Sequence, residues 1–272
     1  MPFSRFRIYH FRWAEFACQT ATRSDLAPPA TRDAGPLVTR RSTVLLLAPA
    51  LVLAACGPGG NPFASFETRC AKLALSRFEV VAVPLSFERD DTQPIAALTV
   101  KSGSTIARHS AIGLTTAVFG QSTDIELHSV DDRRGARACG TPRVHVELSM
   151  QPVMVYVARE LVEAPCQHEI TLSHEMKHVE VFREVLDEAA QDLERELPES
   201  IGTELRRATS PDELQQRLIV AIRDYLAQFM QARQRLLDER QAKVDSPEEY
   251  ARVSTACARS AADLIPAASA TP

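Results

Sequence analysis

The middle of the chain alternates short β-branched and aromatic runs with turn residues, a pattern that predicts β-strands. Clusters of Asp, Gly, Ser and Pro separate the runs, and no helical stretch lies between them. The predicted strands cover residues 78–87, 95–100, 114–119, 124–129, 143–149 and 153–159. Because these strands follow one another directly, we expect them to pair antiparallel. His145 and Glu147 alternate with apolar residues of one strand, which predicts a solvent-facing side there rather than a pair of ligands.

The pattern changes to helical spacing after Cys166. A first helix is predicted from near His168 to about Leu197, where Pro198 permits the stop. A capping box at residues 210–213, with sequence SPDE, predicts a second helix that reaches about Val244. The apolar stripe of the second helix consists of Leu214, Leu218, Ile222, Tyr225, Phe229 and Leu236.

The same capping signal recurs at residues 246–249, SPEE, and predicts a last short helix that carries Cys257. The chain therefore divides into a β-rich half, residues 67–165, and a helical half, residues 166–263. Residues 264–272 are predicted to be a disordered tail. The expected fold class is α+β, with an antiparallel sheet followed by helices.

Residues 38–55 have the features of an export signal. Two arginines precede an apolar run of 12 residues, which is too short to span a bilayer but typical of a signal peptide. The run ends in Leu53-Ala54-Ala55-Cys56, followed by Gly57, which resembles a bacterial lipobox. This resemblance implies cleavage before Cys56, lipidation of that cysteine, and sorting to the outer membrane. The alternative is a buried helix that ends at a free cysteine.

The predicted signal at residues 38–55 separates an N-terminal segment, residues 1–37, from a short segment after it, residues 56–66. We expect residues 1–37 to be an extension produced by a start codon called too early; a long natural leader is the alternative. Residues 56–66 would form a flexible tether between lipid and domain. The chain has a formal net charge of −4, and the 217 residues after position 55 carry −8. This charge argues against nucleic acid as a partner, so membrane attachment would come from the lipid on Cys56.

Four cysteines remain for the folded part, and an even number in an exported chain predicts two disulfides. Residues 143–149 and 153–159 are predicted to form a hairpin, and Cys139 and Cys166 lie almost symmetrically about its turn. We therefore expect a Cys139–Cys166 disulfide at the open end of the hairpin, and Cys70–Cys257 by elimination. A cysteine zinc site is the weaker alternative, since the chain has no Cys-x-x-Cys spacing.

The segment CQHEITLSHEMKHVEVF, residues 166–182, contains the motif His-Glu-x-x-His. His174 and His178 are four residues apart, so a helix presents both rings on one face, where they can bind one Zn²⁺. Glu175 beside them can take a proton from the attacking water and return it to the leaving amine. These residues suit hydrolysis of an amide bond. The alternative is a surface helix whose histidines have this spacing by coincidence.

Together with the strands before it, the motif resembles the zincin metallopeptidases, in particular small secreted bacterial proteins described as zinc-dependent proteases of unknown function. The resemblance is strongest over residues 153–193 and implies His174 and His178 as zinc ligands and Glu175 as general base. Lys177 departs from the family pattern, in which uncharged residues usually stand between the glutamate and the second histidine. A lysine there either points to solvent or marks a relaxed site.

The resemblance implies an acidic third ligand, because the elongated motif with a third histidine is absent after His178. If the two long helices are antiparallel, the motif faces residues 232–240, and Glu239 at the edge of the apolar stripe is our first choice. Asp245, just past the helix end, is the second choice. His168 is a further possibility if the chain before Thr171 is not helical. Tyr250 is either an oxyanion donor or a buried aromatic residue.

The expected function is that of a lipid-anchored zinc metallopeptidase on the periplasmic side of the bacterial envelope. Its substrates would be peptides or proteins of the envelope. Two alternatives remain open at this point. One is a non-catalytic envelope lipoprotein with a structural or vestigial zinc site, and the other is a scaffold stabilised by its two disulfides.

Overall fold

The computed structural model describes residues 64–103, 110–132 and 134–258. The predicted extension, signal peptide, lipidated Cys56, most of the tether and the C-terminal tail lie outside these residues. The helices and strands described below all belong to one unit, which includes the chain from Ser65 onward. Among the described helices, none combines the length and the apolar character needed to span a membrane.

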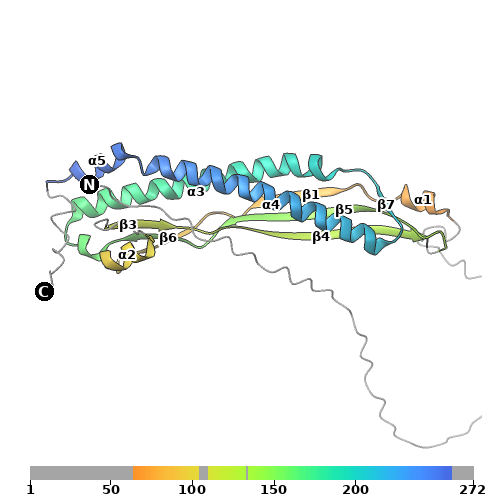
Figure 1. The fold of residues 1–272 in the computed structure, drawn as a ribbon, viewed down its shortest axis with the longest axis horizontal. Coiled ribbons are helices and arrows are strands. Elements are labelled where there is room, and N and C mark those ends of the chain that lie inside the picture. The colour runs from red at the N-terminus through yellow and green to blue at the C-terminus, as the bar shows by residue number, and fades with distance from the viewer. Residues whose placement is uncertain (1–63, 104–109, 133, 259–272) are drawn as a thin grey trace, which may run out of the picture. The chain divides into compact units, whose positions relative to one another are not determined.

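The strands form two sheets (Figure 1). The larger sheet has the order β1 (Arg77–Ala82), β5 (Arg137–Met150), β4 (Phe119–Asp132), and β7 (Arg206–Ala208) also pairs with β5. The smaller sheet has the order β2 (Phe87–Asp90), β6 (Val153–Val157), β3 (Gly113–Thr116). β3 and β2 are therefore the edge strands of the smaller sheet.

Both sheets are mixed, which corrects the prediction of antiparallel pairing throughout. β4 pairs antiparallel with β5, and β3 pairs antiparallel with β6. In contrast, β1 runs parallel to β5 and β2 runs parallel to β6. β1 and β2 are consecutive in sequence but enter different sheets, so they do not pair with each other. β1 pairs with β5 and β2 pairs with β6. Several elements lie between the two strands of each pair, and such long connections allow parallel pairing.

Three predicted strands are wrong in detail. The predicted strand 114–119 contains the end of β3 and the first residue of β4, and residues 117 and 118 belong to neither strand. The predicted strand 78–87 is divided into β1 and β2 by residues 83–86, where Pro84 has no N–H for a sheet ladder. The predicted strand 95–100 is the helix α2 (Ile95–Lys101), which begins directly after Pro94. Ile95 and Leu98 are buried on one face of this helix, three residues apart.

The hairpin β4–β5 gives the larger sheet one buried and one exposed face. Its register runs from Phe119 opposite Met150 to Asp132 opposite Arg137. The apolar residues of β5 from position 144 to position 150 are buried, whereas His145 and Glu147 between them are partly or fully exposed. The predicted solvent-facing side of this strand is confirmed.

The helical half contains α3 (Pro165–Ile201), α4 (Pro211–Val244) and α5 (Pro247–Thr255), with the short strand β7 between α3 and α4. Besides α2, the β-rich half contributes α1 (Phe66–Cys70) and the 3₁₀ turn Arg159–Leu161. α3 continues past Pro198 to Ile201 and is capped by Gly202, which has a φ of 85°. Pro198 is tolerated because it removes only one backbone hydrogen bond near the helix end. α4 begins as predicted, with the Ser210 hydroxyl accepting a hydrogen bond from the Glu213 N–H at 3.2 Å.

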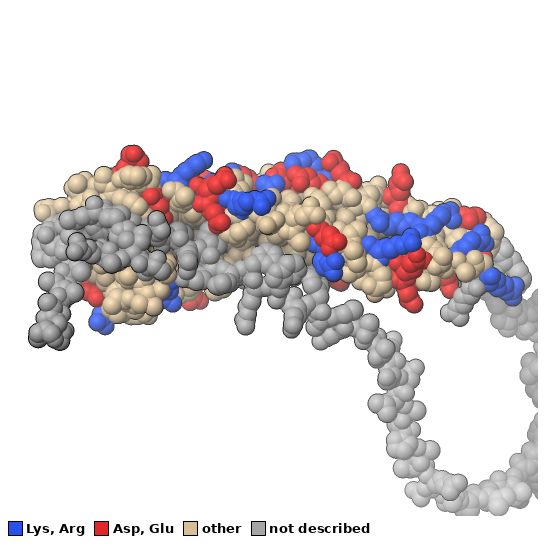
Figure 2. All heavy atoms as spheres, viewed as in Figure 1, with Lys and Arg blue, Asp and Glu red and all other residues tan. Residues whose placement is uncertain are grey.

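α3 and α4 run antiparallel and cover one face of the larger sheet (Figure 1). The core between the layers is apolar and combines β5, α3 and α4, for example Val146, Leu148, Phe182, Leu186, Leu193, Leu218 and Ile222. The N-terminal part of α3 also contacts β3 and β6 of the smaller sheet. The α+β class is confirmed. On the face seen in Figure 2, basic and acidic side chains are interspersed.

Both disulfide pairings differ from the prediction. The disulfides are Cys70–Cys139 and Cys166–Cys257. The prediction assumed a hairpin of β5 and β6, but these strands belong to different sheets, and the hairpin partner of β5 is β4. Cys139 therefore lies beside α1, and Cys166, in the first turn of α3, lies beside the end of α5.

Candidate metal centre

The motif lies on α3 in the part that crosses the smaller sheet. His174, Glu175 and His178 are all buried, with exposed fractions of 4%, 1% and 0%. The Nε2 atoms of His174 and His178 are 3.3 Å apart, since residues four apart on a helix project from the same face. The predicted convergence of the two imidazoles is confirmed.

Asp245 completes a group of three. It is the residue after the last turn of α4, and its Oδ1 lies 3.2 Å from His174 Nε2 and 3.4 Å from His178 Nε2. Oδ1 is buried and makes no hydrogen bond of acceptable geometry, although it is close to both rings. Two imidazole nitrogens and one carboxylate oxygen thus point at a common position where a metal ion could be held.

Burial raises the pKa of the Asp245 carboxyl, but the neighbouring His174 and His178 outweigh this effect and lower its pKa overall. A hydrogen bond from Tyr250 acts in the same direction. The carboxylate is therefore present in the ionised form that a metal ion requires. Tyr250 is partly buried and its ring lies 6.0 Å from that of His174, so it borders the group.

The outer nitrogens of both histidines have acceptors, which favours the tautomer that carries its proton on Nδ1. His178 Nδ1 donates to Gln241 Oε1, and the Gln241 amide donates to the His178 carbonyl at 3.2 Å. This second bond orients the amide so that its oxygen faces the ring. His174 Nδ1 lies 3.3 Å from Glu249 Oε1. With the proton on Nδ1, Nε2 of each neutral ring keeps its lone pair for a metal ion.

Glu175 is not part of the triangle but lies against the edge strand β3. Its Oε2 accepts a hydrogen bond of 2.8 Å from the Thr115 hydroxyl. β3 approaches so closely that a Cβ at Gly113 would lie 2.3 Å from Glu175 Oε1, so a larger residue at this position would displace the Glu175 side chain. Burial raises the pKa of the Glu175 carboxyl, opposed by the nearby His178 and His174 and by the Thr115 hydroxyl.

The structure brings our second choice of third ligand, Asp245, to the histidines and not our first choice, Glu239. Glu239 is exposed on α4. Gln241 and Asp245 are four residues apart and share a face, whereas Glu239, two residues before Gln241, points to the opposite side. His168 lies within α3 and is bound elsewhere, with Nε2 at 3.2 Å from Asp91 Oδ2.

Three residues around the group were not found by sequence reasoning: Thr115, Gln241 and Glu249. Gln241 had a detectable signal, because it continues the buried stripe of α4 one turn before Asp245. Thr115 and Glu249 had none, since their contacts depend on how β3 and α5 pack against α3.

Comparison with protein-family models, curated proteins and solved structures gives no match. The fold and the group of His174, His178 and Asp245 define an α+β protein with a candidate metal centre.

Proposed function

We propose that this protein is a lipid-anchored zinc metallopeptidase of the bacterial envelope, with His174, His178 and Asp245 as zinc ligands and Glu175 as general base. The observation that carries the proposal is the triangle of ligand atoms, whose sides measure 3.2, 3.3 and 3.4 Å. Ligands placed 2.0–2.1 Å from a tetrahedral centre are about 3.3–3.4 Å apart. Two imidazoles and one carboxylate are a common donor set for zinc, and three protein ligands leave the fourth position open.

The surrounding residues support peptide hydrolysis at this position. A zinc ion held there would polarise the scissile carbonyl and lower the pKa of the attacking water. Glu175 would accept the proton of that water and then donate it to the leaving amine, which needs a carboxyl with a raised pKa. Thr115 holds Glu175 Oε2, and Gly113 leaves room for Oε1, so both residues of β3 orient the base.

The cellular location in the proposal comes from the sequence. The lipobox-like segment ending at Cys56 implies export and a lipid anchor, and the two disulfides agree with an oxidising compartment. The substrate would then be a peptide or protein of the cell envelope, hydrolysed at a main-chain amide bond.

A second candidate function is a non-catalytic lipoprotein with a structural zinc site. The burial of the whole group favours this alternative, because the side chains of the three ligands are at most 10% exposed and Glu175 is 1% exposed. A structural site is closed and uses its metal for folding, whereas a peptidase must admit a peptide.

The first test is zinc content, measured by elemental analysis of protein purified from an oxidising compartment. We expect about one zinc per chain, lost in His174→Ala and in Asp245→Ala. Glu239→Ala is the matched control, since it removes an exposed carboxylate of α4 six residues before Asp245, and it should keep the metal. Absence of zinc from folded wild-type protein, even after metal is added, would refute the proposal.

The second test separates catalysis from structure. Glu175→Gln keeps the size of the side chain and should keep zinc, but it should abolish cleavage of a labelled unfolded protein by the zinc-loaded enzyme. If wild type and Glu175→Gln both hold zinc and neither cleaves proteins or envelope peptides, the structural zinc site is the correct interpretation.

A further inference from the structure

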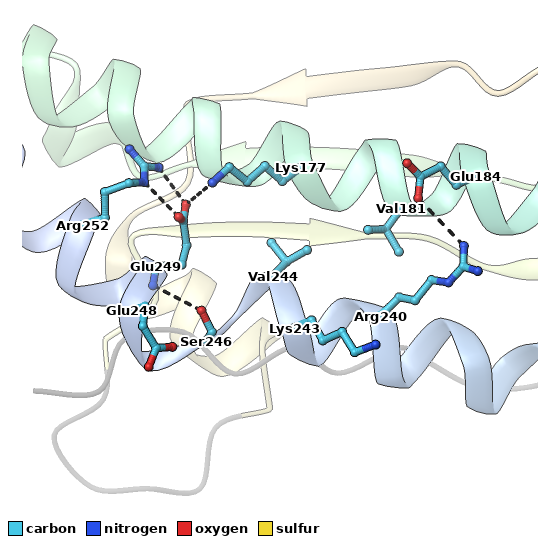
Figure 3. Close-up of a pocket in the computed structure, with 10 residues that line it drawn as sticks. All are labelled: Lys177, Val181, Glu184, Arg240, Lys243, Val244, Ser246, Glu248, Glu249 and Arg252. Carbon is cyan, nitrogen blue, oxygen red and sulfur yellow. Dashed lines mark hydrogen bonds and ion pairs between the residues drawn. The ribbon is translucent and has the colours of Figure 1, made fainter.

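Lys177 is the residue at which the motif departs from the zincin pattern, and the structure shows what it contacts. Its Nζ lies 2.7 Å from Glu249 Oε1, and 46% of its side chain is exposed. Figure 3 shows Lys177 of α3 and Arg252 of α5 approaching the Glu249 carboxylate from two sides. The lysine therefore points along the outside of the metal centre rather than into it.

Glu249 connects this lysine to a ligand. The same Oε1 that accepts from Lys177 lies 3.3 Å from Nδ1 of His174. Arg252 donates to both carboxylate oxygens, at 2.7 and 2.8 Å. The Glu249 side chain is only 12% exposed. The Arg252 guanidinium, followed by Lys177 and His174, lowers the pKa of this carboxyl far below its ordinary value despite its burial.

We propose that Glu249 and Lys177 are positioning residues of the metal centre, Glu249 by accepting the Nδ1 proton of His174 and Lys177 by holding Glu249 against α3. The inference rests on the metal site of the proposed function. A charged acceptor on the outer nitrogen fixes ring orientation and makes the inner nitrogen a better ligand. His178 differs, since its outer nitrogen meets the neutral amide of Gln241.

The contact between Lys177 and Glu249 also helps to place the third ligand, Asp245. Asp245 stands one residue before Ser246, and the Ser246 hydroxyl caps α5 by accepting from the Glu249 N–H at 3.2 Å. Glu249 and Asp245 thus belong to one short segment that this cap links together. When Lys177 binds Glu249, it fixes this segment, and with it Asp245, against the helix that carries both histidines.

The experiment compares Lys177→Met, Lys177→Arg and Glu249→Gln with Lys243→Met. Lys243 lines the same groove in Figure 3 and lies on α4, so its replacement makes the same chemical change at a position that the inference does not use. Zinc affinity is measured by competition with a chelator. The absorption spectrum of the cobalt-substituted protein reports the geometry at the metal, and urea unfolding of the metal-free protein reports general stability.

We expect Glu249→Gln and Lys177→Met to weaken zinc binding by about 10–100-fold, as is typical when an outer partner of a ligand is lost. Lys177→Arg keeps the cation and should recover most of the affinity, while Lys243→Met should match wild type. A wild type that binds zinc, with unchanged affinity and cobalt spectrum in both Lys177→Met and Glu249→Gln, would overturn the inference and leave the proposed function intact. A wild type that binds no zinc would overturn the proposed function itself.

Discussion

The two disulfides lie at opposite ends of the helical layer, and only one of them borders the candidate metal centre (Figure 1). Cys166–Cys257 joins the first turn of α3 to the chain directly after α5, so it encloses the segment with Asp245 and Glu249. Cys70–Cys139 joins α1 to the start of β5. We predict that removing either disulfide costs similar global stability, but that only removal of Cys166–Cys257 weakens metal binding.

The expected global cost follows from the loop lengths. The bonded cysteines are 69 and 91 residues apart in sequence. In the chain-entropy treatment, loops of this length correspond to about 4.4 and about 4.6 kcal/mol at 25 °C. The two values differ by about 0.2 kcal/mol, so the double variants Cys70→Ser/Cys139→Ser and Cys166→Ser/Cys257→Ser should lose nearly the same free energy of unfolding.

The effect on zinc affinity is expected only for Cys166–Cys257. α5 has nine residues, and a helix of that length is marginal without tertiary contacts. Without Cys166–Cys257, the principal polar contacts that tie α5 to α3 are those of Glu249 with Lys177 and His174. We expect zinc affinity to fall about tenfold or more without Cys166–Cys257, which corresponds to about 1.4 kcal/mol or more of zinc-binding free energy, and to stay within about twofold without Cys70–Cys139.

The assay combines urea unfolding of the metal-free variants with zinc competition under conditions in which both remain folded. Because the global costs match, Cys70→Ser/Cys139→Ser corrects the zinc data for any general loss of stability. An equal loss of zinc affinity in the two double variants, or a larger loss in Cys70→Ser/Cys139→Ser, would refute the reasoning that α5 is held over the metal centre by its disulfide.

Three further predictions concern buried and paired side chains. Thr115→Val removes the hydroxyl that donates to Glu175, and should lower the unfolding free energy by about 1.5–3 kcal/mol and reduce turnover with unchanged zinc content, whereas Thr115→Ser should not. Thr171→Val should have the opposite effect, because Thr171 Oγ1 is buried without a hydrogen-bond partner. Its removal should raise the free energy of unfolding, measured with urea, by about 1 kcal/mol, and a lower free energy of unfolding would contradict this account. The third prediction concerns pH: the Arg89 ion pair lowers the pKa of the Asp91 carboxyl, so its contribution is present above the unfolded pKa of about 3.9 and is lost as pH falls through the lower folded pKa. Acid unfolding curves should therefore show a steeper loss of stability below about pH 4 in wild type than in Asp91→Asn, and identical slopes would argue against the ion pair.

The features that the sequence predicted correctly are those set by neighbours in the chain. Ser210 and Ser246 each accept a hydrogen bond from the N–H three residues later, as their capping signals indicate. The spacing of His174 and His178 brings the two Nε2 atoms together because helix geometry alone decides it. The alternation of β5 likewise matches its observed burial.

The errors concern contacts between segments that are distant in sequence. The burial alternation of β5 does not show that its parallel neighbour is β1, more than fifty residues earlier in the chain. Treating β5 and β6 as a hairpin therefore placed Cys139 beside Cys166, although the two strands enter different sheets. Disulfide pairing depends on this topology, which no local pattern of residues determines.

The position of Asp245, the candidate third ligand, could have been found from a stronger signal in the sequence. The buried face of α4 changes from apolar to polar near the end of the helix. Leu237 is followed on the same face by Gln241 and then by Asp245, at steps of four residues. The buried stripe of α3 changes in the same way, from Phe182 to His178. Each change carries an energetic cost unless the polar groups have partners, so two such changes on antiparallel helices indicate a shared polar site. When the apolar-to-polar changes of α3 and α4 are aligned with each other, Asp245 is selected as the candidate third ligand and the exposed Glu239 is excluded. Counting residues from the turn between the helices does not make this distinction.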